Sequence, residues 1–115
     1  MCISKFFVMS LNKLKNVSIL EIGCAYGTSS MIIANALNKL PTKNKTYDVI
    51  DPSQDDYWNG VGHYNLERVI NTDTTVEYVS EISDVALPYL FDKNKTYNLI
   101  FIDGAHDYVK MDILY

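Results

Sequence analysis

Apolar residues follow two different spacings along this chain, and the two alternate. Four short runs are rich in β-branched, aliphatic or aromatic residues and too short for helices, which predicts strands at 17–22, 46–50, 76–79 and 97–102. Between them apolar residues recur at helical spacing, which predicts helices at 31–40, 64–71 and 82–90. Alternation of this kind predicts an α/β fold with a parallel sheet and flanking helices.

The ends of the chain extend this pattern. Apolar residues between Ile3 and Leu14 predict an amphipathic helix that covers the sheet, and the tail 107–115 is predicted to begin a further helix. The hydroxyl side chains of Thr28, Ser29 and Ser30 are predicted to cap the helix that follows them.

Two segments carry breaks or repeats. Pro88 is predicted to kink or shorten its helix, and 53–62 is predicted to be a polar loop, with His63 beside it assigned no role. The five residues 43–47, KNKTY, recur as 93–97, and each copy leads toward a strand that ends in Ile-Asp. Two copies with unlike flanks are no solenoid, so we interpret them as one turn-into-strand arrangement used twice.

A glycine loop joins the first predicted strand to the first predicted helix. Gly23 and Gly27 frame it, and glycines let the backbone approach a ligand closely while the helix start presents free N–H groups. These elements indicate a nucleotide site, although a generic strand-to-helix turn has them too. Ala25 stands where G-x-G-x-x-G has its second glycine, and the phosphate-loop pattern is also absent.

Polar residues gather where the predicted strands end. In an open parallel sheet, ligands bind at the carboxyl ends of the strands. The groups predicted to meet at that edge are Gly23–Gly27, Asp51, Ser80–Ser83 and Asp103–His106.

Two acidic residues carry particular expectations. Asp51 ends the second predicted strand, where a carboxylate can accept hydrogen bonds from both hydroxyls of a ribose. Capping of the next loop is the alternative role, and the side chain is expected to face solvent. Glu21 lies inside an apolar strand, where a carboxylate is costly unless it is paired or hydrogen-bonded. Hydrogen bonds from the loop's own N–H groups would satisfy it.

Two motifs resemble those of a known family. The pattern E-x-G-x-x-x-G at Glu21, Gly23 and Gly27 resembles the first motif of class I S-adenosylmethionine (SAM)-dependent methyltransferases. The segment 101–108, FIDGAHDY, is similar to the I-D-G-x-H-x-Y segment of the small-molecule methyltransferases called family 24. The resemblance implies a Rossmann-like class I domain that transfers a methyl group from SAM to a small-molecule acceptor, at a hydroxyl.

The resemblance also implies roles for particular residues. The cofactor-binding residues would be Glu21, Gly23, Cys24, Ala25, Tyr26, Gly27, Asp51, Ile82, Ser83 and Asp103. In related metal-dependent O-methyltransferases the position of Asp103 is a Mg²⁺ ligand, and that of His106 is a base toward the acceptor hydroxyl. A histidine can take that role because its pKa lies near neutrality. Lining the cofactor without proton transfer is the alternative for His106.

Composition narrows the class of protein further. The chain has 115 residues, 48% of them hydrophobic, and a net charge of −4, which predicts one globular domain and no nucleic-acid partner. Its two cysteines have no metal or disulfide spacing, and its apolar N-terminus is too short for a membrane span. We therefore expect a cytoplasmic protein with no membrane partner.

The predicted strands are fewer than a full class I domain has. The single domain 1–115 is therefore expected to be incomplete, either a fragment or a half completed by a partner, and prone to self-association through an exposed sheet edge. Two alternative functions stay open: a non-catalytic module that binds SAM or a nucleoside, and an NAD-binding oxidoreductase half.

Overall fold

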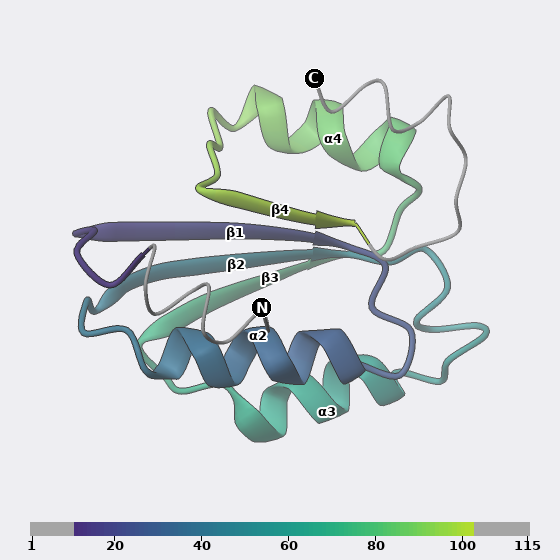
Figure 1. Cartoon of the computed structure of the whole chain (residues 1–115). Coiled ribbons are helices and arrows are strands. Elements are labelled where there is room, and N and C mark those ends of the chain that lie inside the picture. The colour runs from purple at the N-terminus through teal and green to yellow at the C-terminus, as the bar shows by residue number, and fades with distance from the viewer. Residues whose placement is uncertain (1–10, 103–115) are drawn as a thin grey trace.

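Four parallel strands form the centre of the structure, a computed structural model that describes residues 11–102 (Figure 1). The strand order is β3-β2-β1-β4, and all three pairings are parallel. The strands are β1 (Asn16–Ile22), β2 (Asn44–Ile50), β3 (Thr74–Val79) and β4 (Leu99–Ile102). The helices are α2 (Thr28–Asn38), α3 (Val61–Val69) and α4 (Ser83–Asp92). The predicted α/β fold with a Rossmann-like parallel sheet is confirmed.

Helices cover both faces of the sheet. Figure 1 shows α2 and α3 on one face and α4 on the other. Successive residues of a strand point to opposite faces, so Ile19 belongs to the core beneath α2 and α3, while Leu20 belongs to the core beneath α4. Burial on both faces explains why the strands read as nearly continuous apolar runs.

The start of α2 differs from the prediction. The N-cap is Gly27, in a left-handed conformation with φ of 89°, and no side chain caps the helix. Thr28, Ser29 and Ser30 are the first three residues of the helix itself, so the predicted hydroxyl cap is wrong. The physical reason lies in Ser30, whose buried hydroxyl is hydrogen-bonded to Glu21 instead.

Two other boundaries also differ from the prediction. Helix α3 begins at Val61, so His63 lies in its first turn and is not in a loop. Helix α4 contains Pro88 and continues to Asp92, so the proline does not end it early.

The predicted N-terminal helix falls mostly outside the described residues, as do the tail 107–115 and the residues Asp103 and His106. Leu11 is described, and it is buried in the core beside α2. In the described order β4 is an edge strand, and self-association through it stays a prediction. Within 11–102, no helix has the length and apolar character needed to cross a bilayer.

Candidate functional site

The glycine loop connects the carboxyl end of β1 to α2. Gly23 has φ of 94° and Gly27 has φ of 89°, a region that side-chain-bearing residues rarely adopt. The Gly23 N–H donates to the carbonyl of Ile50 at 2.7 Å, and the Gly27 N–H donates to the carbonyl of Cys24 at 2.8 Å. These bonds fix both ends of the loop, while Gly23 itself stays partly exposed.

Asp51 binds this loop from the end of β2. Its Oδ2 accepts hydrogen bonds from the N–H groups of Cys24 at 3.1 Å and Ala25 at 2.8 Å. Oδ2 also accepts one from the Gln54 amide at 3.0 Å, and Oδ1 accepts one from the Ser53 N–H at 2.9 Å. Asp51 is only 4% exposed, so the expectation that it faces solvent is wrong. The carboxylate turns inward because the loop offers it donors there.

The charge of Asp51 is stabilised by these contacts. Burial alone would raise the pKa of the Asp51 carboxyl, because it disfavours the charged form. Hydrogen bonds from Gln54 and from the N–H groups of Ser53, Ala25 and Cys24 outweigh burial and hold the pKa below its ordinary value. Asp51 is therefore an ionised structural partner of the glycine loop.

Gln54 is the residue that sequence reasoning missed. It is fully buried, and its amide nitrogen donates to Asp51 and, at 2.7 Å, to the carbonyl of Ala25. Its amide oxygen accepts hydrogen bonds from the N–H groups of Gly62 at 3.0 Å and His63 at 3.2 Å. One side chain thus joins the glycine loop, the end of β2 and the start of α3. No periodicity marks a single glutamine in a polar segment, so neither spacing nor a motif could have pointed to it.

Glu21 lies on the side of the loop that faces the core. It is fully buried, and its Oε1 accepts hydrogen bonds from the hydroxyls of Ser30 and, at 2.7 Å, Tyr47. The expected hydrogen bonding of this buried carboxylate is present, and hydroxyls from α2 and β2 supply two of its donors. Burial, together with the charge of Glu21, raises the pKa of Tyr47 far above its ordinary value, so Tyr47 remains a donor.

The Cys24 thiol is expected to be unreactive in this loop. The residue is 4% exposed, and its thiol lies 3.3 Å from the Ser30 hydroxyl. Burial raises the pKa of the thiol to about 12, so no thiolate is available near neutral pH. Cys24 contributes packing and a backbone N–H.

Helix α3 packs closely against the loop. A Cβ on Gly62 would lie 2.2 Å from the carbonyl oxygen of Ala25 and 2.6 Å from the Cys24 sulfur. A Cβ on Gly27 would lie 2.8 Å from the carbonyl oxygen of Gly62. Glycine at both positions therefore permits a backbone approach that no other residue would allow.

His63 follows directly in α3 and lies beside β3. Its ring centroid is 4.0 Å from that of Tyr78, and its Nε2 is buried with no hydrogen-bond partner among residues 11–102. Burial lowers the pKa of His63, while the charges of Asp51, Asp55 and Glu67 oppose that shift. His63 thus lies close to the site with a lowered pKa, which favours its neutral form.

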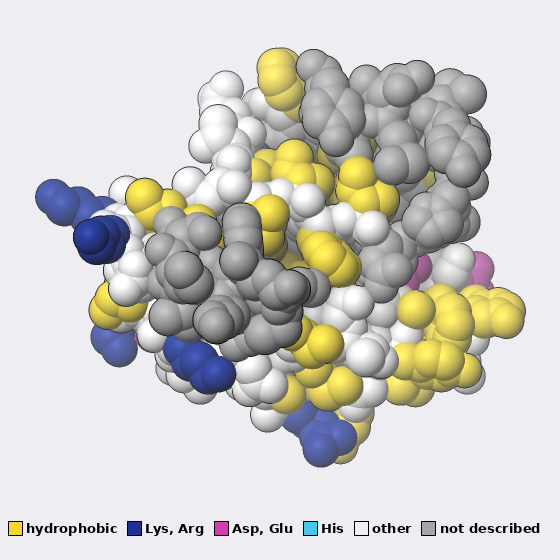
Figure 2. All heavy atoms as spheres, viewed as in Figure 1, with side chains coloured by type: hydrophobic (Ala, Val, Ile, Leu, Met, Phe, Trp, Pro, Cys, Tyr) yellow, Lys and Arg dark blue, Asp and Glu magenta, His cyan; other side chains and the backbone are white. Residues whose placement is uncertain are grey.

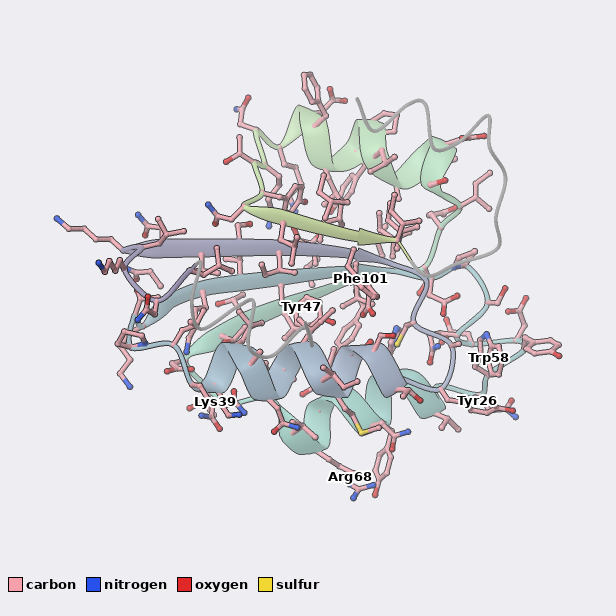
Figure 3. The ribbon with its side chains drawn as sticks, in the orientation of Figure 1. Tyr26, Lys39, Tyr47, Trp58, Arg68 and Phe101 are labelled. Atoms are coloured by element: carbon pink, nitrogen blue, oxygen red, sulfur yellow. The ribbon has the colours of Figure 1, made fainter. Side chains whose placement is uncertain are left out.

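Three aromatic rings lie beside the loop. Figure 3 shows Tyr26 and Trp58 next to one another at the edge of the molecule. The Tyr26 ring, 61% exposed, meets the Trp58 ring edge to face at 4.4 Å, and the Tyr57 ring meets Trp58 at 4.7 Å. The Tyr26 carbonyl accepts a hydrogen bond from the Asn65 amide at 2.7 Å, which ties the loop to α3 once more.

The remaining predicted site residues lie near the ends of β3 and β4. Ile82 is the N-cap of α4 and is 44% exposed, and Ser83 is the first residue of that helix. Both follow the carboxyl end of β3, on the same sheet edge as the glycine loop. Asp103 and His106 lie beyond the described range.

Residues 20–114 match a family model described as a methyltransferase domain, Methyltransf_24. The chain belongs to this methyltransferase family. A search of the curated proteins gave no significant match. The match includes the glycine loop, Asp51 and the segment 101–108, so both motifs that suggested a methyltransferase fall inside it.

Membership implies SAM as the usual methyl donor, whereas it leaves Mg²⁺ without support. Among residues 11–102, no group of three histidine, cysteine, aspartate or glutamate side chains could hold a metal ion. The predicted ligand Asp103 lies outside that range. The described part of this methyltransferase therefore offers no fit for Mg²⁺.

Proposed function

We propose that this methyltransferase domain binds SAM along its glycine loop and transfers the methyl group to a hydroxyl of a small-molecule acceptor. The observation that carries the proposal is the loop held in position by Asp51 and Gln54. Asp51 accepts hydrogen bonds from the N–H groups of Cys24 and Ala25, and Gln54 donates to the carbonyl of Ala25 and to Asp51, at distances between 2.7 and 3.1 Å. A loop already held in one conformation loses little entropy when it binds a ligand.

Three features of the sheet edge fit SAM. Gly23 offers a partly exposed backbone with no side chain, where the cofactor could approach closely. Within residues 11–102, Asp51 Oδ1 accepts a single hydrogen bond, which leaves capacity for one ribose hydroxyl, whereas Oδ2 already accepts three. Ile82 offers an exposed apolar side chain of the kind that would pack against adenine.

The bound cofactor would supply an electrophilic methyl group on its sulfonium. Methyl transfer then needs alignment and a deprotonated acceptor, so positioning is the main contribution of the protein. In this proposal His106 takes the proton from the acceptor hydroxyl, an assignment that rests on its sequence motif alone. We assign no step to Mg²⁺.

Calorimetry with S-adenosylhomocysteine, SAM and NAD tests the cofactor. We expect S-adenosylhomocysteine and SAM to bind and NAD not to bind. We expect Gly23→Ala to abolish the binding of S-adenosylhomocysteine and SAM. Gly60→Ala is the matched control, because Gly60 also has positive φ, 73°, but nothing lies within 4 Å of an added Cβ. Equal binding by both variants would refute the placement of SAM at Gly23, and binding of NAD alone would favour the oxidoreductase alternative.

Turnover separates an enzyme from a binding module. Methyl transfer to a panel of small hydroxyl compounds should depend on His106, so His106→Gln should lose it while it still binds S-adenosylhomocysteine. Cofactor binding without transfer to any acceptor would support the non-catalytic alternative.

A further inference from the structure

Tyr26, Tyr57 and Trp58 form an exposed aromatic surface beside the glycine loop, which we call the aromatic platform. Tyr57 is 72% exposed and Tyr26 is 61% exposed. In the view of Figure 2, hydrophobic side chains gather at the edge of the molecule where Figure 3 labels Tyr26 and Trp58. Exposed aromatic groups gathered in this way often mark a binding surface.

Backbone hydrogen bonds hold the segment that carries Tyr57 and Trp58. The N–H groups of Tyr57 and Trp58 both donate to the Ser53 carbonyl, at 2.9 and 3.0 Å, and the Val61 N–H donates to the Trp58 carbonyl at 3.0 Å. The Gly60 N–H donates to the Gln54 carbonyl at 2.6 Å. Because Gln54 also binds the glycine loop, the backbone that carries Tyr57 and Trp58 is tied to that loop.

The platform rings differ from the other exposed tyrosines in having no cation of their own. Tyr64 lies under the Arg68 guanidinium at 5.6 Å, and Tyr89 lies under the Lys93 ammonium at 4.9 Å. Each of these cations lies four residues after its tyrosine, Arg68 within α3 and Lys93 at the C-cap of α4. No such cation lies over Tyr26, Tyr57 or Trp58 in the part of the chain that the structure describes.

Acidic residues beside the platform add negative charge that has no cation near it among residues 11–102. Asp55 and Asp56 directly precede Tyr57, and both are exposed. Neither side chain has a hydrogen bond or an ion pair within residues 11–102. Electron-rich ring faces and unpaired carboxylates both favour a positively charged ligand, and tryptophan is the best ring partner for one.

We propose that the aromatic platform binds the cationic group of the acceptor, a protonated amine or a quaternary ammonium. Its role as an acceptor site rests on the proposed function, whereas binding of a cation does not. The platform would hold the charged end of the molecule while its hydroxyl lies at the glycine loop. Such an acceptor is a small hydroxyl compound that carries an amino or trimethylammonium group.

Trp58 is the single tryptophan of the chain, so its fluorescence reports on the platform directly. We would titrate the full chain with choline and with its neutral isostere, in which a tert-butyl group replaces the trimethylammonium group. We expect saturable binding of choline, with the isostere roughly fivefold weaker or more, as expected for loss of a cation–π contact. Absence of saturable binding, or equal binding of both compounds, would overturn the proposal.

Three variants locate the cation. Tyr57→Ala and the double variant Asp55→Asn/Asp56→Asn should each weaken choline binding roughly fivefold. Tyr64→Ala is the matched control, because Tyr64 is 64% exposed but already lies under Arg68, and it should bind choline as the wild type does. Equal weakening by the control and by Tyr57→Ala would overturn the assignment to the platform.

Repeating the titration with saturating S-adenosylhomocysteine, which is uncharged at sulfur, separates the two proposals. Undiminished choline binding is expected, since platform and cofactor are proposed to be adjacent and distinct. Displacement of choline would overturn the acceptor role, because the platform would then belong to the cofactor site. Choline binding by a chain that fails to bind S-adenosylhomocysteine would refute the proposed function and leave the cation site standing.

Discussion

Replacing Asp51 by alanine should destabilise the fold even without a cofactor. The substitution removes the acceptor of four hydrogen bonds, two of them from the buried donors Cys24 N–H and the Gln54 amide. Water can reach the partly buried donors of Ala25 and Ser53, so we count the two buried bonds alone. A hydrogen bond to a charged group contributes about 1.5–3 kcal/mol, so we expect Asp51→Ala to lower the free energy of unfolding by about 3–6 kcal/mol.

Urea unfolding followed by circular dichroism measures this loss. Asp56→Ala is the matched control, since Asp56 is an exposed aspartate of the same segment with no partner among residues 11–102, and it should change stability by less than about 0.5 kcal/mol. Asp51→Asn should lose less than the alanine variant, because it keeps one acceptor oxygen, and it keeps the test interpretable if Asp51→Ala does not fold. A loss below about 1 kcal/mol in both Asp51 variants would refute the structural role.

The same carboxylate predicts a pH dependence. The folded state holds the pKa of Asp51 below its ordinary value of 3.8, so its stabilisation is complete above that value. As the pH falls through the folded pKa, the carboxylate is protonated and this stabilisation is lost. The free energy of unfolding of the wild type should therefore fall more steeply in acid than that of Asp51→Asn, and parallel curves would contradict the assignment.

Two further predictions concern the buried residues Lys45 and Cys24. Lys45→Met should lower the free energy of unfolding in urea by about 2–4 kcal/mol, because the buried Lys45 ammonium donates to the carbonyls of Leu37 and Leu40 and pairs with Asp73. Lys43→Met is the control: its side chain is 82% exposed, so the substitution should lower that free energy by less than about 0.5 kcal/mol. In a Cys2→Ser background, the Cys24 thiol should react with a thiol reagent only after unfolding, since burial raises its pKa to about 12; equal reaction rates in buffer and in urea would contradict this.

The sequence was sufficient for the order and type of the elements because each depends on local spacing. The strand predicted at 46–50 lies within β2, and the helix predicted at 31–40 overlaps most of α2. Boundaries were less predictable where a side chain has a competing partner. Ser30 resembled a cap residue, yet it is the third residue of α2, and its hydroxyl donates a hydrogen bond to Glu21 of β1. That competition depends on strand-to-helix packing and is invisible to local rules.

The repeated KNKTY segment also has side-chain partners that local sequence rules do not predict. In the first copy Tyr47 donates to Glu21 at 2.7 Å beneath α2. In the second copy Tyr97 donates to Asp48 at 2.7 Å beneath α4, and Lys95 pairs with that carboxylate at 3.2 Å. Both tyrosines thus satisfy a buried strand carboxylate, on opposite faces of the sheet. The repeat predicted a common turn, but its shared role depends on strand register.

The contacts of Asp51 change how the cofactor site should be tested. The N–H groups of Cys24 and Ala25 already donate to this carboxylate, so a ligand would have to displace it to use them. Contact with the loop is therefore expected at the backbone of Gly23, which is partly exposed. A weakened cofactor affinity in an Asp51 variant would mix loss of the ribose contact with loss of the loop conformation. Gly23→Ala, compared with Gly60→Ala, tests the contact with the loop by a change that leaves the Asp51 side chain itself intact.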